Sequence, residues 1–508
     1  MAQGRAAHHR AAMARGIEQL HFTDEDFSRF QQRLRENLAA LRLVLARPGF
    51  GVGPVTLGAE LELCIVDGHG RAKGVNRDIL DSRIDPHLTL ELNKFNLEYN
   101  LTPVSAAGRP FSALEQELHH AVQSLNETAC PMGARIIPIG ILPTLTPDDV
   151  ARTALTDYPR YRALSDGLRR VKRSPFTIRI DGADPLQMEG DDITLEGANT
   201  SFQLHLRVAP DDFAATYNAA QLATSIALAV SGNSPIFCEH RLWEETRVAL
   251  FKQALDVRDL LEHLWRPPAR VSFGHGWVRE GAYELFAESV AVFPPLFPQC
   301  GEEDAVATAE RGDSPLLEEL RLQQGTVWRW NRAVYDPVDD GHLRIELRAL
   351  PAGPTPIDMT ANAAFLIGLT IGLRDDVDRI LPAFPFEYAA WNFYRAAQHG
   401  LDAELLWPSE LAPSPTTMKA RTLVSRFLPV AARGLQALGV DGDEVTRLLA
   451  VIAGRLETGQ TGARWQRAAF DRCLATRPRR EALACMMEGY IAHALSGCPV
   501  HEWEPWQG

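Results

Sequence analysis

The sequence lacks the short motifs that usually mark nucleotide and metal sites. No G-x-x-x-x-G-K-[ST] loop or G-x-G-x-x-G turn follows a predicted strand, and no H-E-x-x-H occurs on a predicted helix. The seven cysteines include no C-x-x-C pair, which argues against zinc-ribbon and dithiol redox sites. Scattered cysteines in odd number favour reduced thiols in a cytoplasm. Any nucleotide would therefore be held by strand side chains and metal ions.

Long apolar runs and excess positive charge are also missing. Runs such as Ile226–Val230 fall far short of the ~20 residues that span a bilayer. The formal net charge of −13 argues against nucleic acid or an anionic membrane as the main partner. The first residues are basic but have no apolar core of a secretory signal. We expect a soluble cytoplasmic protein with a disordered extension over residues 1–22.

One stretch organises the rest of the chain: Thr56–Asp67 reads TLGAELELCIVD. Strand alternation places Glu60 and Glu62 on one face and leucine and isoleucine side chains on the other. Like charges held side by side repel, and burying them unpaired costs several kcal/mol or more. A positive group is therefore expected between these two carboxylates.

Three later stretches repeat this alternation of apolar and polar faces. They are Leu90–Leu101, Ser201–Val208 and Leu343–Leu350. A one-sided antiparallel sheet gives such a pattern, whereas a parallel sheet covered on both faces reads as continuous apolar runs. The four stretches predict an antiparallel sheet with one polar face.

The polar faces of these strands carry the chemistry of a metal and phosphate site. Carboxylate oxygens suit Mg²⁺ or Mn²⁺, and arginine suits phosphate. For any single strand, a solvated polar face is an equally simple explanation. Glu346, between Arg344 and Arg348, could instead belong to a structural ion network. Taken together, the faces predict a cup for metal ions and a polyphosphate.

The fold class follows from these strands and from the helical patterns around them. We expect an α+β fold in which a curved, mainly antiparallel sheet forms an active-site cup, with helices on its outer face. The catalytic domain is expected over residues 23–374, and a helical C-terminal region over residues 375–508. This helical region is either a separate lobe or part of the same domain. The segment Gly325–Asp336, rich in aromatic residues and arginine, looks exposed.

Five motifs occur in order along residues 56–373: GAELEL, LELNKFNLEYNLTP, SFQLHLRV, SGNSP and HLRIELRALPAGPT. In this order they resemble the family-2 glutamate–cysteine ligases, a carboxylate–amine ligase branch of the glutamine-synthetase-like superfamily. Each is weak alone, and their order makes the resemblance. The sequence departs at Gln203, where many relatives carry histidine, and at the bulky Arg207.

The resemblance implies an ATP- and Mg²⁺-dependent (or Mn²⁺-dependent) ligase of glutathione biosynthesis. Such an enzyme joins the γ-carboxylate of glutamate to an amine, by default L-cysteine, through an acyl phosphate. By position, the implied metal ligands are Glu60, Glu62, Glu91, Glu98, His205 and Glu346. The implied phosphate and nucleotide contacts are Gln203, Arg344 and Arg348, the two arginines having the catalytic role.

Substrate contacts are harder to assign, because arginine and tryptophan also pack or lie on surfaces. The candidates are Asn100, Arg241, Arg247, Trp328 and Arg332. Alternative functions are a ligase for another acid or amine, a guanidino kinase, a metal-dependent hydrolase, or a binding protein of the same fold without catalysis. A hydrolase would not need arginines around Glu346, and a silent relative would be expected to lose an acidic ligand. The partners expected are small molecules only, with no prediction of oligomeric state.

Overall fold

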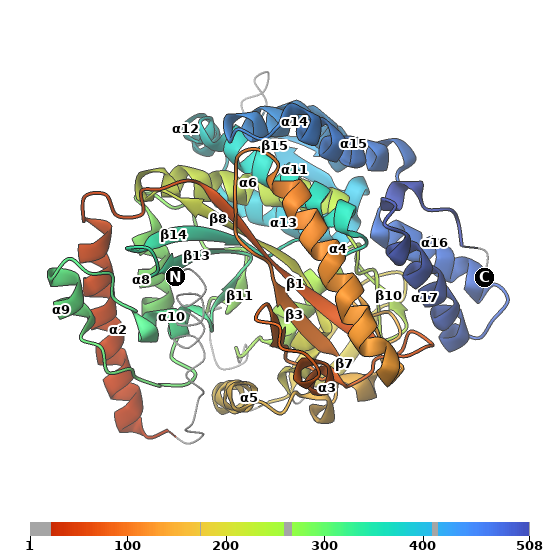
Figure 1. Ribbon diagram of the computed structural model, residues 1–508, viewed down its shortest axis with the longest axis horizontal. Helices are drawn as coiled ribbons and strands as arrows, with labels where there is room; N and C mark the ends of the chain where they lie inside the picture. The colour runs from red at the N-terminus through yellow and green to blue at the C-terminus, as the bar shows by residue number, and fades with distance from the viewer. Residues whose placement is uncertain (1–21, 173, 191, 259–266, 409–414, 507–508) are drawn as a thin grey trace.

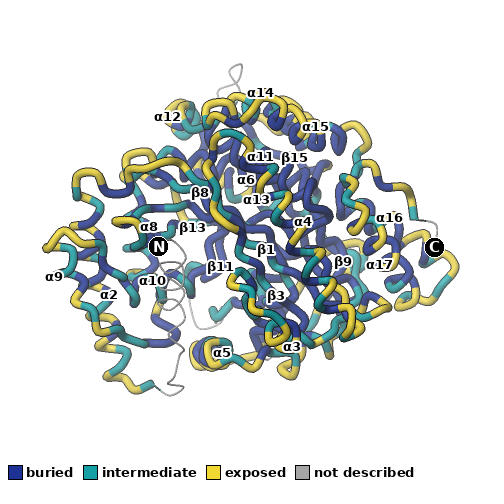
Figure 2. Tube along the Cα trace, viewed as in Figure 1, coloured by how far each residue is buried: buried dark blue, intermediate teal, exposed yellow. Residues whose placement is uncertain are grey.

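The computed structural model describes most of the chain (Figure 1); the described residues are 22–172, 174–190, 192–258, 267–408 and 415–506. The extension expected over residues 1–22 lies outside these ranges except for its last residue. Figure 2 shows buried residues concentrated in the strands and inner helices, with exposed residues on the peripheral ones.

A single antiparallel sheet organises the molecule, as the strand pattern predicted. Its main path runs in the order β13-β14-β8-β1-β3-β2, with the short strands β4 and β5 also pairing with β1. The bounds are β1 (Thr56–Val66), β2 (Leu88–Leu90), β3 (Asn96–Asn100), β4 (Val104–Ser105), β5 (Arg135–Ile137), β8 (Phe202–Val208), β13 (Asn331–Asp336) and β14 (His342–Leu347). Every pair in this sheet is antiparallel, so the α+β fold with its strongly curled sheet is confirmed.

Strand register brings the polar side chains of different strands into line. Glu62 on β1 lies directly opposite Glu98 on β3. Glu346 on β14 lies directly opposite His205 on β8. Glu60 precedes Glu62 by two residues and therefore shares its face of β1. The predicted ligands thus meet on one side of the sheet because alternation and register agree.

Long apolar helices cover the other side of the sheet. They are α4 (Pro110–Ala129), α6 (Phe213–Ser231) and α11 (Pro356–Arg374), and α14 (Ala420–Ala437) packs against α11. Helices α11 and α14 approach so closely that a Cβ on Gly434 would overlap the Gly368 carbonyl oxygen. By length and composition α11 could cross a membrane, but 94% of its apolar window is buried inside the protein. It is the central core helix.

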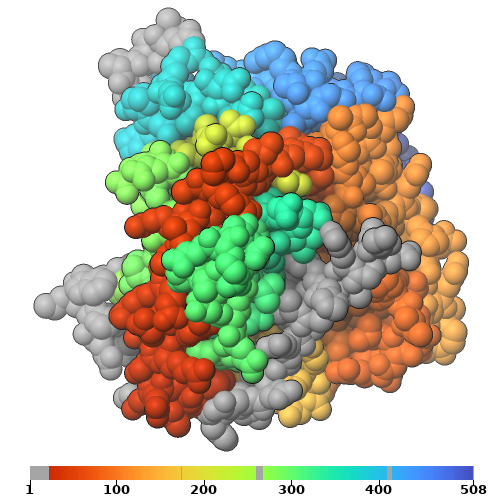
Figure 3. Space-filling model, turned by 60° about the vertical axis from the view of Figure 1, so that its left-hand side comes forward, coloured from red at the N-terminus to blue at the C-terminus, as the bar shows by residue number. Residues whose placement is uncertain are grey.

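The N-terminal helix α2 (Asp24–Leu45) lies beside segments from the middle of the chain. Thr23 caps it through a reciprocal pair of hydrogen bonds with Asp26. Arg33 of α2 pairs with Glu319 at 3.0 Å between Nε and Oε1. Figure 3 shows these red N-terminal residues in contact with green residues near position 300. The helix therefore closes one flank of the cup.

The C-terminal region is mainly helical, as predicted. It holds α13 (Phe386–His399), α15 (Gly442–Thr458), α16 (Gly462–Leu474) and α17 (Arg479–Ser496), with a two-stranded sheet of β15 (Glu404–Trp407) and β16 (Thr416–Lys419). Helices α16 and α17 share a second apolar core with Cys64 and Val66 of β1. The domain boundary at residue 374 stays a prediction.

The remaining elements are short and lie around the sheet. The helices are α3 (Asn76–Asp81), α5 (Pro159–Val171), α7 (Thr246–Ala254), α8 (Ala282–Val292), α9 (Ala305–Glu310), α10 (Glu318–Gln324) and α12 (Val377–Ile380). The strands are β6 (Phe176–Ile180), β7 (Leu186–Gly190), β9 (Ile236–Phe237), β10 (His240–Arg241), β11 (Val271–Ser272) and β12 (Trp328–Arg329).

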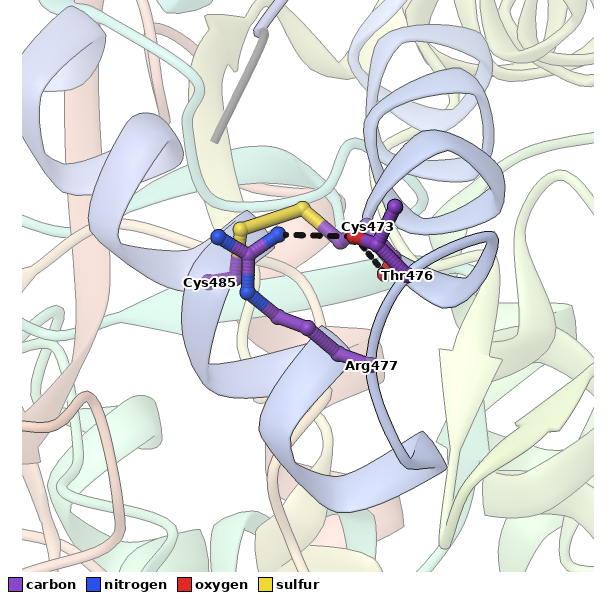
Figure 4. Close-up of a disulfide and its surroundings, with 4 residues drawn as sticks. All are labelled: Cys473, Thr476, Arg477 and Cys485. Carbon is purple, nitrogen blue, oxygen red and sulfur yellow. Dashed lines mark hydrogen bonds between the residues drawn. A yellow bond between two sulfur atoms is a disulfide. The ribbon is translucent and has the colours of Figure 1, made fainter.

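Two expectations from the sequence are wrong. The segment that looked exposed contains β12 and β13, and both Trp328 and Trp330 are buried. Its arginines form ion pairs with carboxylates, as Arg332 does with Glu346, and this pairing allows charged side chains to lie away from the surface. The second error concerns cysteine, because Cys473 and Cys485 form a disulfide between α16 and α17 (Figure 4). Their separation of twelve residues matches no motif, and only the packing of the two helices brings them together.

Candidate active site

Three predicted ligands from three neighbouring strands form one compact group. The potential ligand atoms of Glu60, His205 and Glu346 all lie within 4.8 Å of one another. We name this group the His205 cluster. The His205 Nε2 lies 2.9 Å from Glu60 Oε1, so the imidazole and the carboxylate share a hydrogen bond. Two oxygen ligands and one imidazole are a donor set that suits Mn²⁺ or Mg²⁺.

Arginines balance the charge of the His205 cluster. Arg348 Nη1 donates to Glu346 Oε1 at 2.8 Å, and Arg332 Nη2 donates to the same oxygen at 2.9 Å. Burial alone would raise the pKa of Glu346, but the two guanidinium groups outweigh burial and hold that pKa well below its usual range. Burial likewise opposes ionisation of Glu60, and His205 outweighs it to lower the Glu60 pKa. Both carboxylates are therefore ionised at neutral pH.

A second group of three acids lies beside the first. The carboxylates of Glu62, Glu91 and Glu98 also lie within 4.8 Å of one another, and we name them the Glu98 cluster. Glu62 and Glu98 come from adjacent strands, and Glu91 follows the last residue of β2. Asn100 Nδ2 donates to Glu98 Oε1 at 2.7 Å, so this predicted substrate contact instead orients a carboxylate.

Among the described residues, no arginine or lysine forms an ion pair with an acid of the Glu98 cluster. The pKa of Glu98 is raised to about 7 by burial and by the carboxylates of Glu60 and Glu62. Burial and the carboxylates of Glu98 and Glu62 raise the pKa of Glu91 well above its usual range. Burial also raises the pKa of Glu62, although Arg348 and Arg247 oppose it. Three half-buried carboxylates that repel one another fit a divalent cation by their chemistry.

A chain of hydrogen bonds links the two clusters through Arg348. Its Nη1 donates to Gln203 Oε1 at 2.6 Å as well as to Glu346. The Gln203 amide in turn donates from Nε2 to Glu62 Oε1 at 2.8 Å. Ser201 N–H donates to the other Glu62 oxygen at 2.7 Å. Gln203, which departs from the expected histidine, therefore positions Glu62 and Arg348 relative to each other.

A pocket opens next to Glu62 and Arg348. Its lining includes Glu62, Glu196, Arg247, Phe251, Trp330 and Arg348. Glu196 was not among the residues predicted from the sequence. Burial and the Glu62 carboxylate raise its pKa to about 8, and the charge of Arg348 opposes this rise. Its only sequence signal was the turn EGANT just before the histidine strand. The pocket brings cationic, anionic and aromatic groups beside the acidic clusters.

Arg247 is the predicted substrate residue that reaches this pocket. Its Nε lies 3.3 Å from Glu245 Oε1, and its Nη atoms lie within 3.5 Å of the carbonyl oxygens of Ala349 and Leu350. Burial lowers the pKa of Arg247, against the charges of Glu245 and Glu62. These partners fix the guanidinium at the pocket wall.

The other predicted contacts lie elsewhere. Arg344 Nη2 lies 3.2 Å from Asp336 Oδ2, next to the His205 cluster but outside its ligand set. Trp328 packs edge-on against Phe251, behind the pocket. Arg241 on β10 is held by Asp184 and Asp471, an ion network away from the sheet, and geometry gives no support to its substrate role.

Known proteins resemble this chain in family and in fold. The model of glutamate–cysteine ligase family 2 matches residues 56–495. A crystal structure of glutamate–cysteine ligase from Francisella tularensis in complex with AMP shares the fold, at a TM-score of 0.53 and 10% sequence identity. The match covers 88% of this chain and 90% of that one.

Two further solved structures match with lower TM-scores. They are a bifunctional glutathione synthetase from Pasteurella multocida (TM-score 0.44, 13% identity, 92% of this chain and 56% of that chain) and the complex of the prokaryotic ubiquitin-like protein Pup with its ligase (TM-score 0.37, 10% identity, 84% and 71%). A search of curated proteins finds no match. The family match over most of the chain shows that this protein belongs to glutamate–cysteine ligase family 2 and is an ATP-dependent carboxylate–amine ligase.

Proposed function

We propose that this ligase joins the γ-carboxylate of glutamate to an amine, with L-cysteine as the default acceptor, using ATP and Mg²⁺. The observation that carries the proposal is the pair of acidic clusters on one sheet face, bridged by Arg348. A phosphoryl transfer needs its negative charge neutralised and its reactants aligned. The paired clusters and their arginines offer both on neighbouring strands.

The residues of the two clusters would hold the divalent cations. Glu60, His205 and Glu346 supply one ligand set, and Glu62, Glu91 and Glu98 supply the other. Bound Mg²⁺ would neutralise phosphate oxygens and draw electrons from the phosphorus. The hydrogen bonds from Asn100 to Glu98 and from Ser201 to Glu62 keep these carboxylates oriented toward the shared face.

The proposed reaction has two steps. In the first, an oxygen of the glutamate γ-carboxylate attacks the γ-phosphorus of ATP, which gives an acyl phosphate and ADP. In the second, the amine nitrogen attacks the acyl carbon, phosphate leaves, and the amine loses a proton as the amide forms. Arg348, hydrogen-bonded to Glu346 and Gln203, lies where it can stabilise the transferring phosphoryl group.

The pocket beside Glu62 supports an amino acid as the carboxylate substrate. Arg247 is buried and cationic, and Glu196 is a half-buried acid whose carboxylate has no hydrogen bond among the described residues. Such a pair matches an α-carboxylate and an α-ammonium group. Phe251 and Trp330 add an apolar wall for the methylene groups. We therefore assign this pocket to the glutamate backbone.

The test is ADP release by the full chain with Mg²⁺ and ATP, with product masses determined. Glutamate and cysteine are supplied together and separately, and other acids and amines replace each in turn. We expect ADP release that needs both substrates and a product heavier than glutamate by cysteine minus water. The matched variants are Arg247→Gln and the exposed Arg135→Gln, and only the first should raise the KM for glutamate. No amide product with any acid and amine would overturn the proposal.

A further inference from the structure

Two arginines face each other immediately beyond the His205 cluster. Arg207 on β8 is the register partner of Arg344 on β14. Each lies two residues from its neighbour in the cluster, His205 or Glu346, and so shares the face of those ligands. Like charges directly opposite one another on adjacent strands are destabilising. An anion between or above these guanidinium groups would remove that repulsion.

The protein supplies less negative charge here than the two arginines require. Asp336 lies 3.2 Å from Arg344. Among the described residues, no carboxylate forms an ion pair with Arg207. The Nε atoms of Arg207 and Arg344 are both buried and have no hydrogen-bond partner within that part of the chain. Within the described part of the chain, Arg207 is therefore a partly buried cation without a carboxylate partner.

A glycine turn brings main chain directly against Arg207. The turn connects α2 to β1 and reads GFGVG over residues 49–53. A Cβ on Gly53 would lie 2.6 Å from Arg207 Nη2 and 2.9 Å from its Cζ. Glycine at this position leaves room for the guanidinium that any larger residue would displace. The turn therefore fixes where the Arg207 side chain can lie.

We propose that Arg207, positioned by Gly53, binds the phosphates of the nucleotide on the side of the His205 cluster that Arg344 also borders. A guanidinium offers paired N–H donors that match phosphate oxygens, and it stays charged when partly buried. This inference rests on the proposed function, because it requires ATP at these clusters. It also explains the departure of the sequence at this position, since an arginine there adds a phosphate contact.

Binding of unreactive nucleotides tests the inference without turnover. ADP, AMP and adenosine are titrated calorimetrically into the Mg²⁺-loaded wild type and into the Arg207→Gln and Arg207→Lys variants. We expect Arg207→Gln to bind ADP about tenfold more weakly, the effect of one charge-assisted hydrogen bond. Adenosine affinity should not change, and Arg207→Lys should lie between. The matched control is Arg135→Gln, an exposed arginine on β5.

The glycine provides an independent variant. Gly53→Ala should weaken ADP binding several-fold because its Cβ displaces the guanidinium, whereas Gly68→Ala, with nothing within 4 Å of its Cβ, should not. Unchanged ADP affinity in Arg207→Gln, or equal loss for adenosine, would overturn this inference and leave the proposed function standing. A wild type that binds no nucleotide would overturn both.

Discussion

The two acidic clusters have nearly the same geometry but opposite electrostatics. In the His205 cluster, burial is outweighed by Arg332, Arg348 and His205, and the pKa values of Glu60 and Glu346 are lowered. In the Glu98 cluster, burial and mutual repulsion dominate, and the pKa values of its three acids are raised. The difference comes from where the cations lie and from the number of acids, since the His205 cluster holds two acids and an imidazole whereas the Glu98 cluster holds three acids.

This contrast separates two ways of keeping carboxylates buried. The His205 cluster carries its counter-charge in the protein, so it stays ionised and ordered before any cation binds. In the Glu98 cluster, a bound cation or protons must neutralise the negative charge of the carboxylates. Removing an acid should therefore harm the first cluster and relieve the second.

The largest effect is expected from Glu346→Gln. This change leaves the partly buried guanidinium groups of Arg332 and Arg348 without the buried carboxylate that they share. Removing one partner of a buried ion network costs about 3–5 kcal/mol. Urea unfolding of the metal-free protein measures the loss. The matched variant is Glu98→Gln, and an equal loss of stability in both would refute the contrast between the clusters.

Arg348→Lys should lower kcat by at least ~100-fold, the loss expected for one preorganised electrostatic donor. Lysine keeps the charge but cannot bond Glu346 and Gln203 with a planar fork. The KM for ATP should change much less, because the contact matters most in the transition state. Steady-state ADP release at saturating glutamate and acceptor gives both constants. Full kcat with only a lower melting temperature would make Arg348 structural.

A smaller effect is expected from Glu98→Gln on metal dependence. Removing one of three repelling carboxylates should raise the Mg²⁺ concentration for half-maximal activity by at least about tenfold. The metal-free protein should unfold no more easily than the wild type, because the removed group was held at a raised pKa. Mg²⁺ titration of activity measures the shift. The control is the exposed Glu302→Gln, and an unchanged Mg²⁺ requirement would remove Glu98 from the ligand set.

The smallest effect is a pH dependence of stability without metal. Burial and neighbouring carboxylates raise the pKa of Glu98 to about 7 and that of Glu196 to about 8, from 4.5 for an unperturbed glutamate. At pH values between the unfolded and the folded pKa, the folded state binds more protons than the unfolded state. The free energy of unfolding therefore falls as the pH rises from about 5 to 8. Glu60 and Glu346 have lowered pKa values and lose their contribution only below about pH 4.5.

Thermal melts in EDTA across pH 5–8 would reveal this slope. Saturating Mg²⁺ should flatten it, because a cation replaces the protons on the Glu98 cluster. Glu98→Gln should reduce the slope in EDTA, and Glu302→Gln should not. A melting temperature that rises steadily with pH in EDTA would show that the raised pKa values do not govern this range.

Much of the sheet could be predicted from the sequence because strand alternation is local. The stretch Thr56–Asp67 alternates so regularly that both its strand and its polar face follow from residue order. The order of five motifs gave the family. The segment Gly325–Asp336 was misjudged because arginine signals exposure in a sequence, and its pairing with Glu346 depends on a neighbouring strand.

The substrate pocket could not be predicted in the same way. Glu196 precedes its strand by six residues, and only folding brings it beside Glu62 and Arg348. Arg241 and Arg247 looked equivalent in the sequence, yet one pairs with Asp184 and the other reaches the pocket. The disulfide between Cys473 and Cys485 likewise depends on how α16 and α17 pack.

By itself, the sequence determined which residues share a strand face, because side-chain direction alternates with period two whatever the rest of the chain does. It therefore determined that Glu60 and Glu62 lie on the same face of one strand, and that Arg344, Glu346 and Arg348 lie on the same face of another. Only the tertiary structure decided how charge is shared between the clusters. Register between strands sets which cation lies beside which acid, and register is fixed by packing across the whole sheet.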